Sequence, residues 1–308
     1  MEGQNIYDVI SRRTNGDICI GVVGPVRTGK STFIKRFMDT LVIPNIDSEY
    51  RRERATDELP QSSAGRTIMT TEPKFIPEQA VSITVDGTAN LNVRLIDCVG
   101  YIVPSALGYI ENNAPRMVKT PWFEEEVPFN MAAELGTQKV ITEHSTIGLV
   151  VTTDGSITEI PREEYAEAEE RVVNELKAIH KPFVVLLNSL NPTSSGVLQL
   201  SAELEKKYGV PVCPVNCLDM NEAEIRRILE KVLFEFPVRE IGIELPRWLT
   251  SLDKTHPIRK AIFDSIRDSA ASLSRISQIP SMVEDIAACE YLDNAKMVGV
   301  ELGRGSSE

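Results

Sequence analysis

Residues 24–31 have the types and spacing of a phosphate-binding loop. The segment GPVRTGKS fits the pattern G-x-x-x-x-G-K-[ST]. In this pattern the glycines let backbone N–H groups face a phosphate, Lys30 reaches the β and γ phosphates, and the Ser31 hydroxyl binds Mg²⁺. The alternative is an ordinary glycine-containing turn. The residues expected to contact a nucleotide here are Gly24, Arg27, Thr28, Gly29, Lys30, Ser31 and Thr32.

A second motif supplies a candidate metal ligand. Asp97-Cys98-Val99-Gly100 fits the pattern D-x-x-G and follows a run typical of a strand. We expect Asp97 to act with Ser31 at Mg²⁺, and the Gly100 N–H to meet the γ phosphate. The alternative is an aspartate that ends a strand and forms a turn.

The segment between these motifs contains a pair of threonines, Thr70 and Thr71, followed by Pro73. Switch loops offer a threonine that senses the γ phosphate through Mg²⁺ or water, and Pro73 favours an extended exit. We expect Thr70 and Thr71 to be catalytic together with Lys30 and Asp97, with Thr71 also a metal ligand. The alternative is a plain pair of loop threonines.

The residues that would read the base depart from the guanine pattern N-K-x-D. After the buried run 183–187 the chain has Asn188-Ser189-Leu190-Asn191, so lysine and aspartate are both missing. Asn191 lacks the charge that accepts the guanine protons. We therefore predict ATP rather than GTP, with Asn188 among the nucleotide-binding residues.

Arg27 lies within the phosphate loop and is a candidate for promoting hydrolysis. Tyr101 and Ile102 stand where many GTPases have a water-orienting glutamine, so the water must be held otherwise. A similar R-T-G-K-S arrangement occurs in guanylate-binding proteins, where the arginine acts in cis. An arginine finger raises the rate by about 10³- to 10⁵-fold. We hypothesise that self-association brings Arg27 onto the phosphates; the alternative is a solvent-facing arginine.

Strands and helices alternate along the first part of the chain. Apolar runs predict strands at 17–23, 81–85, 91–96, 146–152, 183–187 and 210–215, and apolar periodicity predicts helices at 28–41, 131–143, 165–179, 198–208 and 221–234. Residues 42–80 are predicted to be mostly loop, 81–96 a hairpin, and 104–130 a surface insertion. The pattern indicates a P-loop NTPase domain over 1–237, of the small-GTPase-like (TRAFAC) type, with a mostly parallel sheet and one antiparallel strand.

The pattern changes after Pro237. Alternating apolar residues at 241–245 predict a strand, and 258–274 and 281–291 are predicted helices. We interpret 238–308 as a smaller mixed α/β domain, the start of a truncated middle region.

Composition excludes several classes of protein. The 308 residues include 33 Lys plus Arg and 45 Asp plus Glu, giving a net charge of −12, which argues against binding nucleic acid. With 42% hydrophobic residues and apolar runs of only about five, the chain is globular and has no transmembrane segment. The lack of a leader pattern and the five scattered cysteines favour the cytoplasm.

The whole chain resembles the stage IV sporulation protein A family of spore-coat ATPases. The segments that carry the resemblance are GVVGPVRTGKSTFIKRFM, DELPQSSAGRTIMTTEPKFIP, LIDCVGY, PRMVKTPWFEEEVPF, EHSTIGLVVTTDGSI and ELGRG. By this resemblance Lys30 is the Walker A lysine, Thr70 and Thr71 are sensor threonines, and Asp97 is the Walker B aspartate. Family members continue into a C-terminal region beyond the equivalent of ELGRG, so the chain is expected to be shortened.

The resemblance also implies a function and partners. It implies a Mg²⁺-dependent ATPase that hydrolyses ATP to polymerise into the basement layer of the spore coat, in the mother cell at the outer forespore membrane. It implies other copies of the chain, a small amphipathic membrane-anchor peptide and other coat proteins as partners. The alternative is a nucleotide-binding switch or passive scaffold with little turnover.

Overall fold

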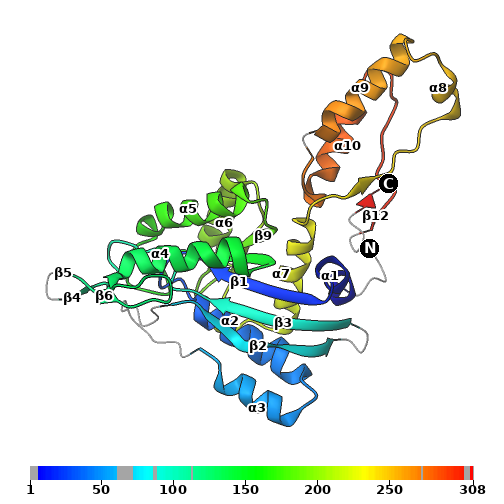
Figure 1. The fold of residues 1–308 in the computed structure, drawn as a ribbon. Helices are drawn as coiled ribbons and strands as arrows, with labels where there is room; N and C mark the ends of the chain where they lie inside the picture. The colour runs from blue at the N-terminus through cyan, green and yellow to red at the C-terminus, as the bar shows by residue number, and fades with distance from the viewer. Residues whose placement is uncertain are drawn as a thin grey trace. The chain divides into compact units, whose positions relative to one another are not determined.

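The computed structural model describes residues 6–60, 72–85, 89–111, 114–271, 273–301 and 306–307. The chain forms two compact units, Met1–Val232 and Leu233–Glu308, whose elements are labelled in Figure 1. The domain division at residue 237 that we predict from the sequence stays a proposal.

A six-stranded sheet forms the centre of the first unit as far as it is described. Its strands are β1 (Asp17–Val23), β2 (Lys74–Val85), β3 (Ala89–Asp97), β8 (Ile147–Thr153), β9 (Phe183–Asn188) and β10 (Val212–Val215), in the spatial order β10-β9-β8-β1-β3-β2. Neighbouring strands run parallel except β2, which is antiparallel to β3. This confirms the predicted α/β fold with a mostly parallel sheet and one antiparallel strand.

Helices cover both faces of this sheet (Figure 1). They are α1 (Ile6–Thr14), α2 (Lys30–Phe37), α3 (Glu49–Asp57), α4 (Phe129–Lys139), α5 (Ala166–Ala178), α6 (Ser195–Tyr208) and α7 (Glu222–Phe234). One buried cluster joins α4, α5 and α6 to alternate strand residues such as Ile96, Val150 and Val185. Since successive strand side chains point to opposite faces, the intervening Leu95, Leu149 and Val184 face the other side. The strands are therefore buried on both faces, as their unbroken apolar runs predict.

The prediction that residues 42–80 are mostly loop is wrong in two places. Glu49–Asp57 forms α3, which begins after Ser48 and is supported by an ion pair of 2.9 Å between Arg54 and Glu58. Only Ala55 of this helix is buried, so it lacks the apolar stripe that reveals a helix in a sequence. Strand β2 also begins at Lys74 rather than 81, since its first residues pair with β3 across an irregularity between Ile76 and Val81.

Helices α2 and α4 end before the predicted residues 41 and 143 because each continues as a π-helical turn. Helix α2 begins at Lys30, since Gly29 before it has a left-handed φ of 95°. It ends at Phe37 and continues as a π-helical turn, Met38–Val42. A second π-helical turn, Val140–His144, follows α4. The insertion between β3 and α4 contains short paired strands: β4 (Ile110–Glu111) with β5 (Ala114–Pro115), and β6 (Met117–Val118) with β7 (Val127–Pro128).

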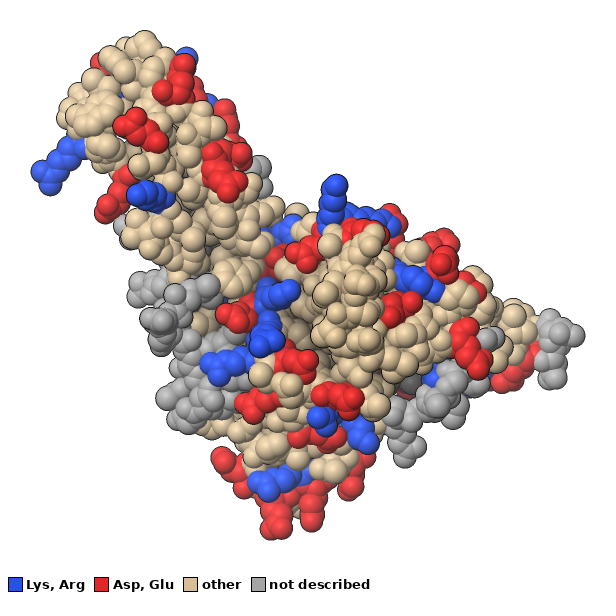
Figure 2. All heavy atoms as spheres, turned by 180° about the vertical axis from the view of Figure 1, so that it is seen from behind, with Lys and Arg blue, Asp and Glu red and all other residues tan. Residues whose placement is uncertain are grey.

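The second unit is small and mainly helical. It contains β11 (Glu240–Ile241), α8 (Arg247–Ser251), α9 (Pro257–Ala271), α10 (Ile279–Ala287), β12 (Val300–Glu301) and β13 (Ser306–Ser307). The two long predicted helices are confirmed, but the strand predicted over 241–245 is reduced, in the part of the chain that the structure describes, to Glu240 and Ile241. No helix in the described ranges is both long and apolar enough to cross a bilayer. On the face shown in Figure 2, acidic and basic side chains are interspersed.

Candidate nucleotide site

The sheet topology brings the predicted motifs together at the carboxyl ends of the parallel strands. Strand β1 lies between β3 and β8, so the connections from these strands diverge at its carboxyl end. In open α/β sheets, ligands bind at this kind of switch point. The phosphate-loop residues follow β1, Asp97 ends β3, and Asn188 ends β9. Segments far apart in the sequence therefore converge on the first turn of α2.

The phosphate loop has a backbone that excludes most other residues. Gly24 has a φ of 137° and Gly29 a φ of 95°. A Cβ at Gly24 would lie 2.2 Å from the Val151 carbonyl oxygen, and one at Gly29 would lie 2.3 Å from Asn188 Nδ2. Arg27 also adopts a left-handed φ, of 62°, which is uncommon for a residue with a side chain. Strained backbone of this kind clusters at functional sites.

Lys30 is buried beneath the loop that it is predicted to serve. Its side chain donates a hydrogen bond of 2.6 Å from Nζ to the carbonyl oxygen of Pro25, within the same loop. Burial lowers the pKa of Lys30, opposed by the nearby Cys98 and Asp97. Thr28 Oγ1 also donates to the Pro25 carbonyl, at 3.0 Å. The ammonium group therefore lies against the backbone of the loop that we expect to bind the phosphates.

Ser31 and Asp97, the two residues that we predict to bind a metal together, are in contact. Ser31 Oγ donates to Asp97 Oδ2 at 2.6 Å. Asp97 is 4% exposed, and its other oxygen, Oδ1, is buried with no hydrogen-bond partner among the residues described. Burial raises the pKa of Asp97, opposed by the hydrogen bond from Ser31 and by Lys30. A half-buried hydroxyl beside a buried carboxylate with a spare oxygen fits Mg²⁺, which takes one or two carboxylates beside phosphate oxygens.

The D-x-x-G segment closes against the phosphate loop. Val26 N–H donates to the Tyr101 carbonyl at 2.9 Å, and Tyr101 N–H donates to the Gly24 carbonyl at 3.3 Å. These bonds resume the β1–β3 pairing beyond Asp97, with one residue more on the β3 side. A Cβ at Gly100 would lie 2.1 Å from the Gly24 carbonyl oxygen, so only glycine permits this approach. The Gly100 N–H donates to Thr137 Oγ1 at 3.2 Å.

Asn188 joins two loops. Its Nδ2 donates to the Thr28 carbonyl at 3.0 Å, and its Oδ1 accepts from Cys217 N–H at 3.1 Å. Both polar atoms of the amide are therefore used within the protein. Asn188 therefore links the phosphate loop to the loop after β10.

A further aspartate that sequence reasoning missed links the residues after β8 to those after β9. Asp154 directly follows β8 and accepts from Ser156 N–H at 3.0 Å and Ser189 Oγ at 2.7 Å. Burial alone would raise the pKa of Asp154, but hydrogen bonds from Ser156 and Ser189 outweigh burial and lower it. Asn191 N–H donates to Ser189 Oγ at 3.0 Å. The available signal was Asp154-Gly155 at the end of a buried strand.

The remaining predicted residues are placed as follows. Arg27 is half-buried, and burial lowers its pKa while nearby Tyr165 opposes this. Thr32 lies in the first turn of α2 and is half-buried. Thr70 and Thr71 lie outside the described residues.

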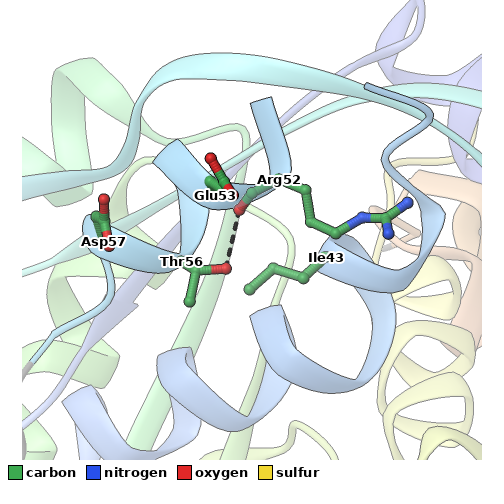
Figure 3. A pocket seen from close by; sticks show the side chains of 5 residues that line it. All are labelled: Ile43, Arg52, Glu53, Thr56 and Asp57. Carbon is green, nitrogen blue, oxygen red and sulfur yellow. Dashed lines mark hydrogen bonds between the residues drawn. The ribbon is translucent and has the colours of Figure 1, made fainter. Parts of the chain in front are cut away.

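A separate cavity of about 380 Å³ lies beside α3, away from these motifs (Figure 3). It is lined by Ile43, Arg52, Glu53, Thr56 and Asp57. Arg52 donates to the Ile46 carbonyl at 2.8 Å, and Thr56 donates to the Arg52 carbonyl at 2.8 Å. None of the phosphate-loop residues lines this cavity, so we place the candidate site at the switch point.

Comparison with known proteins adds to this geometry. Residues 1–237 match the family model of the stage IV sporulation protein A ATPase domain, and residues 238–308 match that of its middle domain. Stage IV sporulation protein A of Bacillus anthracis is 50% identical over all of this chain and 63% of its own length. The Clostridioides difficile protein is 51% identical over 98% of this chain and 61% of its own length.

The chain therefore spans about three fifths of the length of these relatives. A solved structure, a variant of SsGBP, is 14% identical to this chain, with a TM-score of 0.38 over 72% of this chain and 56% of its own. With both domain models matched in order and half the residues identical along its length, the chain belongs to the stage IV sporulation protein A family.

Proposed function

We propose that this chain is a Mg²⁺-dependent ATPase of the TRAFAC type whose turnover drives self-assembly. The observation that carries the proposal is the Ser31–Asp97 pair at the switch point, with the buried Asp97 Oδ1 available to a cation. The description of residues 1–237 as an ATPase domain supports hydrolysis as the reaction.

The phosphate loop would bind and orient the triphosphate. Backbone N–H groups at the start of α2 would face the phosphates, where the helix N-terminus adds partial positive charge. Lys30 would exchange the Pro25 carbonyl for the β and γ phosphates. Ser31 and Asp97 would hold Mg²⁺, which supplies neutralisation of phosphate charge when bound. Thr70 and Thr71 remain the proposed sensors of the γ phosphate.

We propose ATP as the nucleotide because the guanine-reading residues are absent. Serine and asparagine replace the lysine and aspartate of N-K-x-D at Ser189 and Asn191. The Asn191 side-chain oxygen accepts from Thr193 Oγ1 at 3.2 Å. Competition against a fluorescent ATP analogue tests this, and GTP displacing the probe far better than ATP would reject it.

Arg27 is the proposed finger that stabilises the transition state after self-association. It lies in the loop itself, in a left-handed conformation that fixes where its side chain leaves the backbone. Turnover per subunit should rise with protein concentration, and Arg27→Ala should lower it by about 10³-fold. Turnover independent of concentration, with a loss below about tenfold, would refute this role.

We further propose that the assembled form is the basement layer of the spore coat. This rests on the name of the relatives and the resemblance of the whole chain. The outer forespore membrane in the mother cell is the proposed location. Other copies of the chain, a small amphipathic anchor peptide and other coat proteins are the proposed partners.

A second candidate function is a nucleotide-bound switch or scaffold with little turnover. Tyr101 favours it, because the residue in the water-orienting position donates its hydroxyl to Glu175 Oε2 at 2.5 Å. Arg171 also lies 4.1 Å from the centre of the Tyr101 ring. The Tyr101 side chain is therefore committed to α5 rather than to a water molecule.

Phosphate release separates the two functions. We expect wild-type chain to release phosphate from ATP with Mg²⁺, and Lys30→Ala to reduce release at least about 100-fold. Lys35→Ala is the matched control, since Lys35 is an exposed lysine on the same helix. Release absent from wild type and Lys30→Ala alike, with nucleotide still bound by wild type, would favour the scaffold.

A further inference from the structure

The amide of Gly100 lies in the proposed site but donates away from it. A Cβ at Gly100 would lie 2.6 Å from Lys30 Nζ, so this backbone lies directly beside the phosphate-binding ammonium. Its N–H nevertheless donates to Thr137 Oγ1 at 3.2 Å. The amide that the sequence assigns to the γ phosphate is thus held by a side chain of α4.

Thr137 is fixed in the orientation that accepts this bond. The residue is fully buried, and its hydroxyl donates to the Ala133 carbonyl at 2.8 Å, one turn earlier in α4. With its proton directed to its own helix, the hydroxyl presents a lone pair to Gly100. Thr137 is therefore set as an acceptor for the Gly100 N–H.

The same turn of α4 touches the exit of the predicted switch segment. A Cβ at Gly136 would lie 3.0 Å from Pro73 Cδ and 3.1 Å from the Trp122 ring. Neighbouring residues of one helix thus contact Gly100 on one side and Pro73 on the other. A movement of α4 would therefore displace both segments.

We propose that Thr137 and the γ phosphate compete for the Gly100 N–H, so that α4 responds to whether a nucleoside triphosphate or diphosphate is bound. The inference rests on the proposed nucleotide site. The N–H carries one proton, and a charged phosphate oxygen is a stronger acceptor than a hydroxyl. Thr137 itself touches no phosphate, which makes it a positioning residue.

Replacing the acceptor tests this competition. Thr137→Val keeps the shape of the side chain but removes the oxygen acceptor, which leaves the buried Gly100 N–H with the nearby Cys98 sulfur, a weak acceptor, until a γ phosphate arrives. The affinity for the slowly hydrolysed ATP analogue AMP-PNP should therefore rise roughly tenfold relative to that for ADP. ADP affinity should stay within about twofold of wild type, since ADP offers no oxygen at this position. Calorimetric titration with Mg²⁺ present measures both affinities.

Two control variants separate the bond from general effects. Thr137→Ser retains the hydroxyl and should keep the wild-type affinity ratio. Thr142→Val removes the comparable bond from Thr142 Oγ1 to the Gln138 carbonyl, which involves no amide of the site. It should also leave the ratio unchanged.

The outcomes distinguish this inference from the proposed function. If wild type binds neither nucleotide, the nucleotide site is refuted, and this inference with it. If wild type binds both and Thr137→Val shows the same ratio, the competition alone is refuted.

A second measurement needs no folded valine variant. In threonine-methyl NMR spectra of the wild-type chain, the Thr137 methyl signal is assigned by its loss in Thr137→Ser. The signal should shift with AMP-PNP and stay in place with ADP. A methyl signal that responds equally to the two nucleotides would overturn the inference.

Discussion

Asn188 links two loops through two hydrogen bonds, and the loss of these bonds gives a prediction for the free energy of unfolding. Asn188→Ala removes the bonds of 3.0 Å to the Thr28 carbonyl and 3.1 Å from Cys217 N–H. Both partner residues are fully buried, so neither group regains water easily. A buried group left unsatisfied costs about 1–3 kcal/mol. Allowing for partial relaxation, we expect the free energy of unfolding to fall by about 2–4 kcal/mol.

Urea unfolding of the chain, followed by circular dichroism, measures this change. Asn191→Ala is the matched control, because among the described residues the Asn191 side chain bonds to the exposed Thr193 alone. This substitution should change the free energy by less than about 0.5 kcal/mol. Nucleotide affinity should fall in Asn188→Ala alone, since the Thr28 carbonyl anchors the phosphate loop. A loss below about 1 kcal/mol at an unchanged denaturant slope would show that the bridge does not hold these loops.

Three further perturbations follow from the geometry of the same unit. Gly24→Ala should abolish nucleotide binding in calorimetry, because the new Cβ would lie 2.2 Å from a backbone oxygen, whereas Gly196→Ala meets nothing within 4 Å and should leave binding unchanged. The pKa of Asp154 is lowered on folding, so its contribution to stability is present above its ordinary pKa and lost as the pH falls through the folded value. Asp154→Asn should flatten that acid dependence in urea unfolding at pH 3–7, and an unchanged pH profile would contradict the assigned bonds. Burial raises the pKa of the Cys217 thiol to about 12, so iodoacetamide at pH 8 should spare it while alkylating the half-buried Cys289, as read by peptide mass spectrometry; equal labelling of native protein would argue against this burial.

Much of the first unit could be predicted because its signals are local. Each central strand is an unbroken apolar run, and α7 begins with reciprocal bonds between Asn221 and Glu224 of 2.9 and 3.1 Å. A strand or a helix cap of this kind needs only neighbouring residues. Helix α3 was missed since its stability comes from capping and charge pairs on a polar surface, which leave no apolar period.

The candidate site, too, could be predicted only in part from the sequence. The phosphate loop is recognisable because its backbone needs glycine at fixed spacings and its lysine and serine sit on the first turn of the following helix. Neither Thr137 nor Asp154 lies in a motif of fixed spacing. Arg27 lies in such a motif, but the motif does not say which way its side chain points. Their roles depend on elements that only folding brings together.

The sequence by itself determined the glycine-rich loop after β1, the candidate metal ligands Ser31 and Asp97, and the alternation that produces a parallel sheet, since each rests on residue types within a short span. Only the tertiary structure decided which groups those residues hold. The Gly100 N–H meets a hydroxyl 37 residues away, and Asn188 reaches a carbonyl 160 residues away. A hydrogen bond at such separation depends on how helices pack on the sheet, and that packing is set by the whole buried core rather than by any one segment.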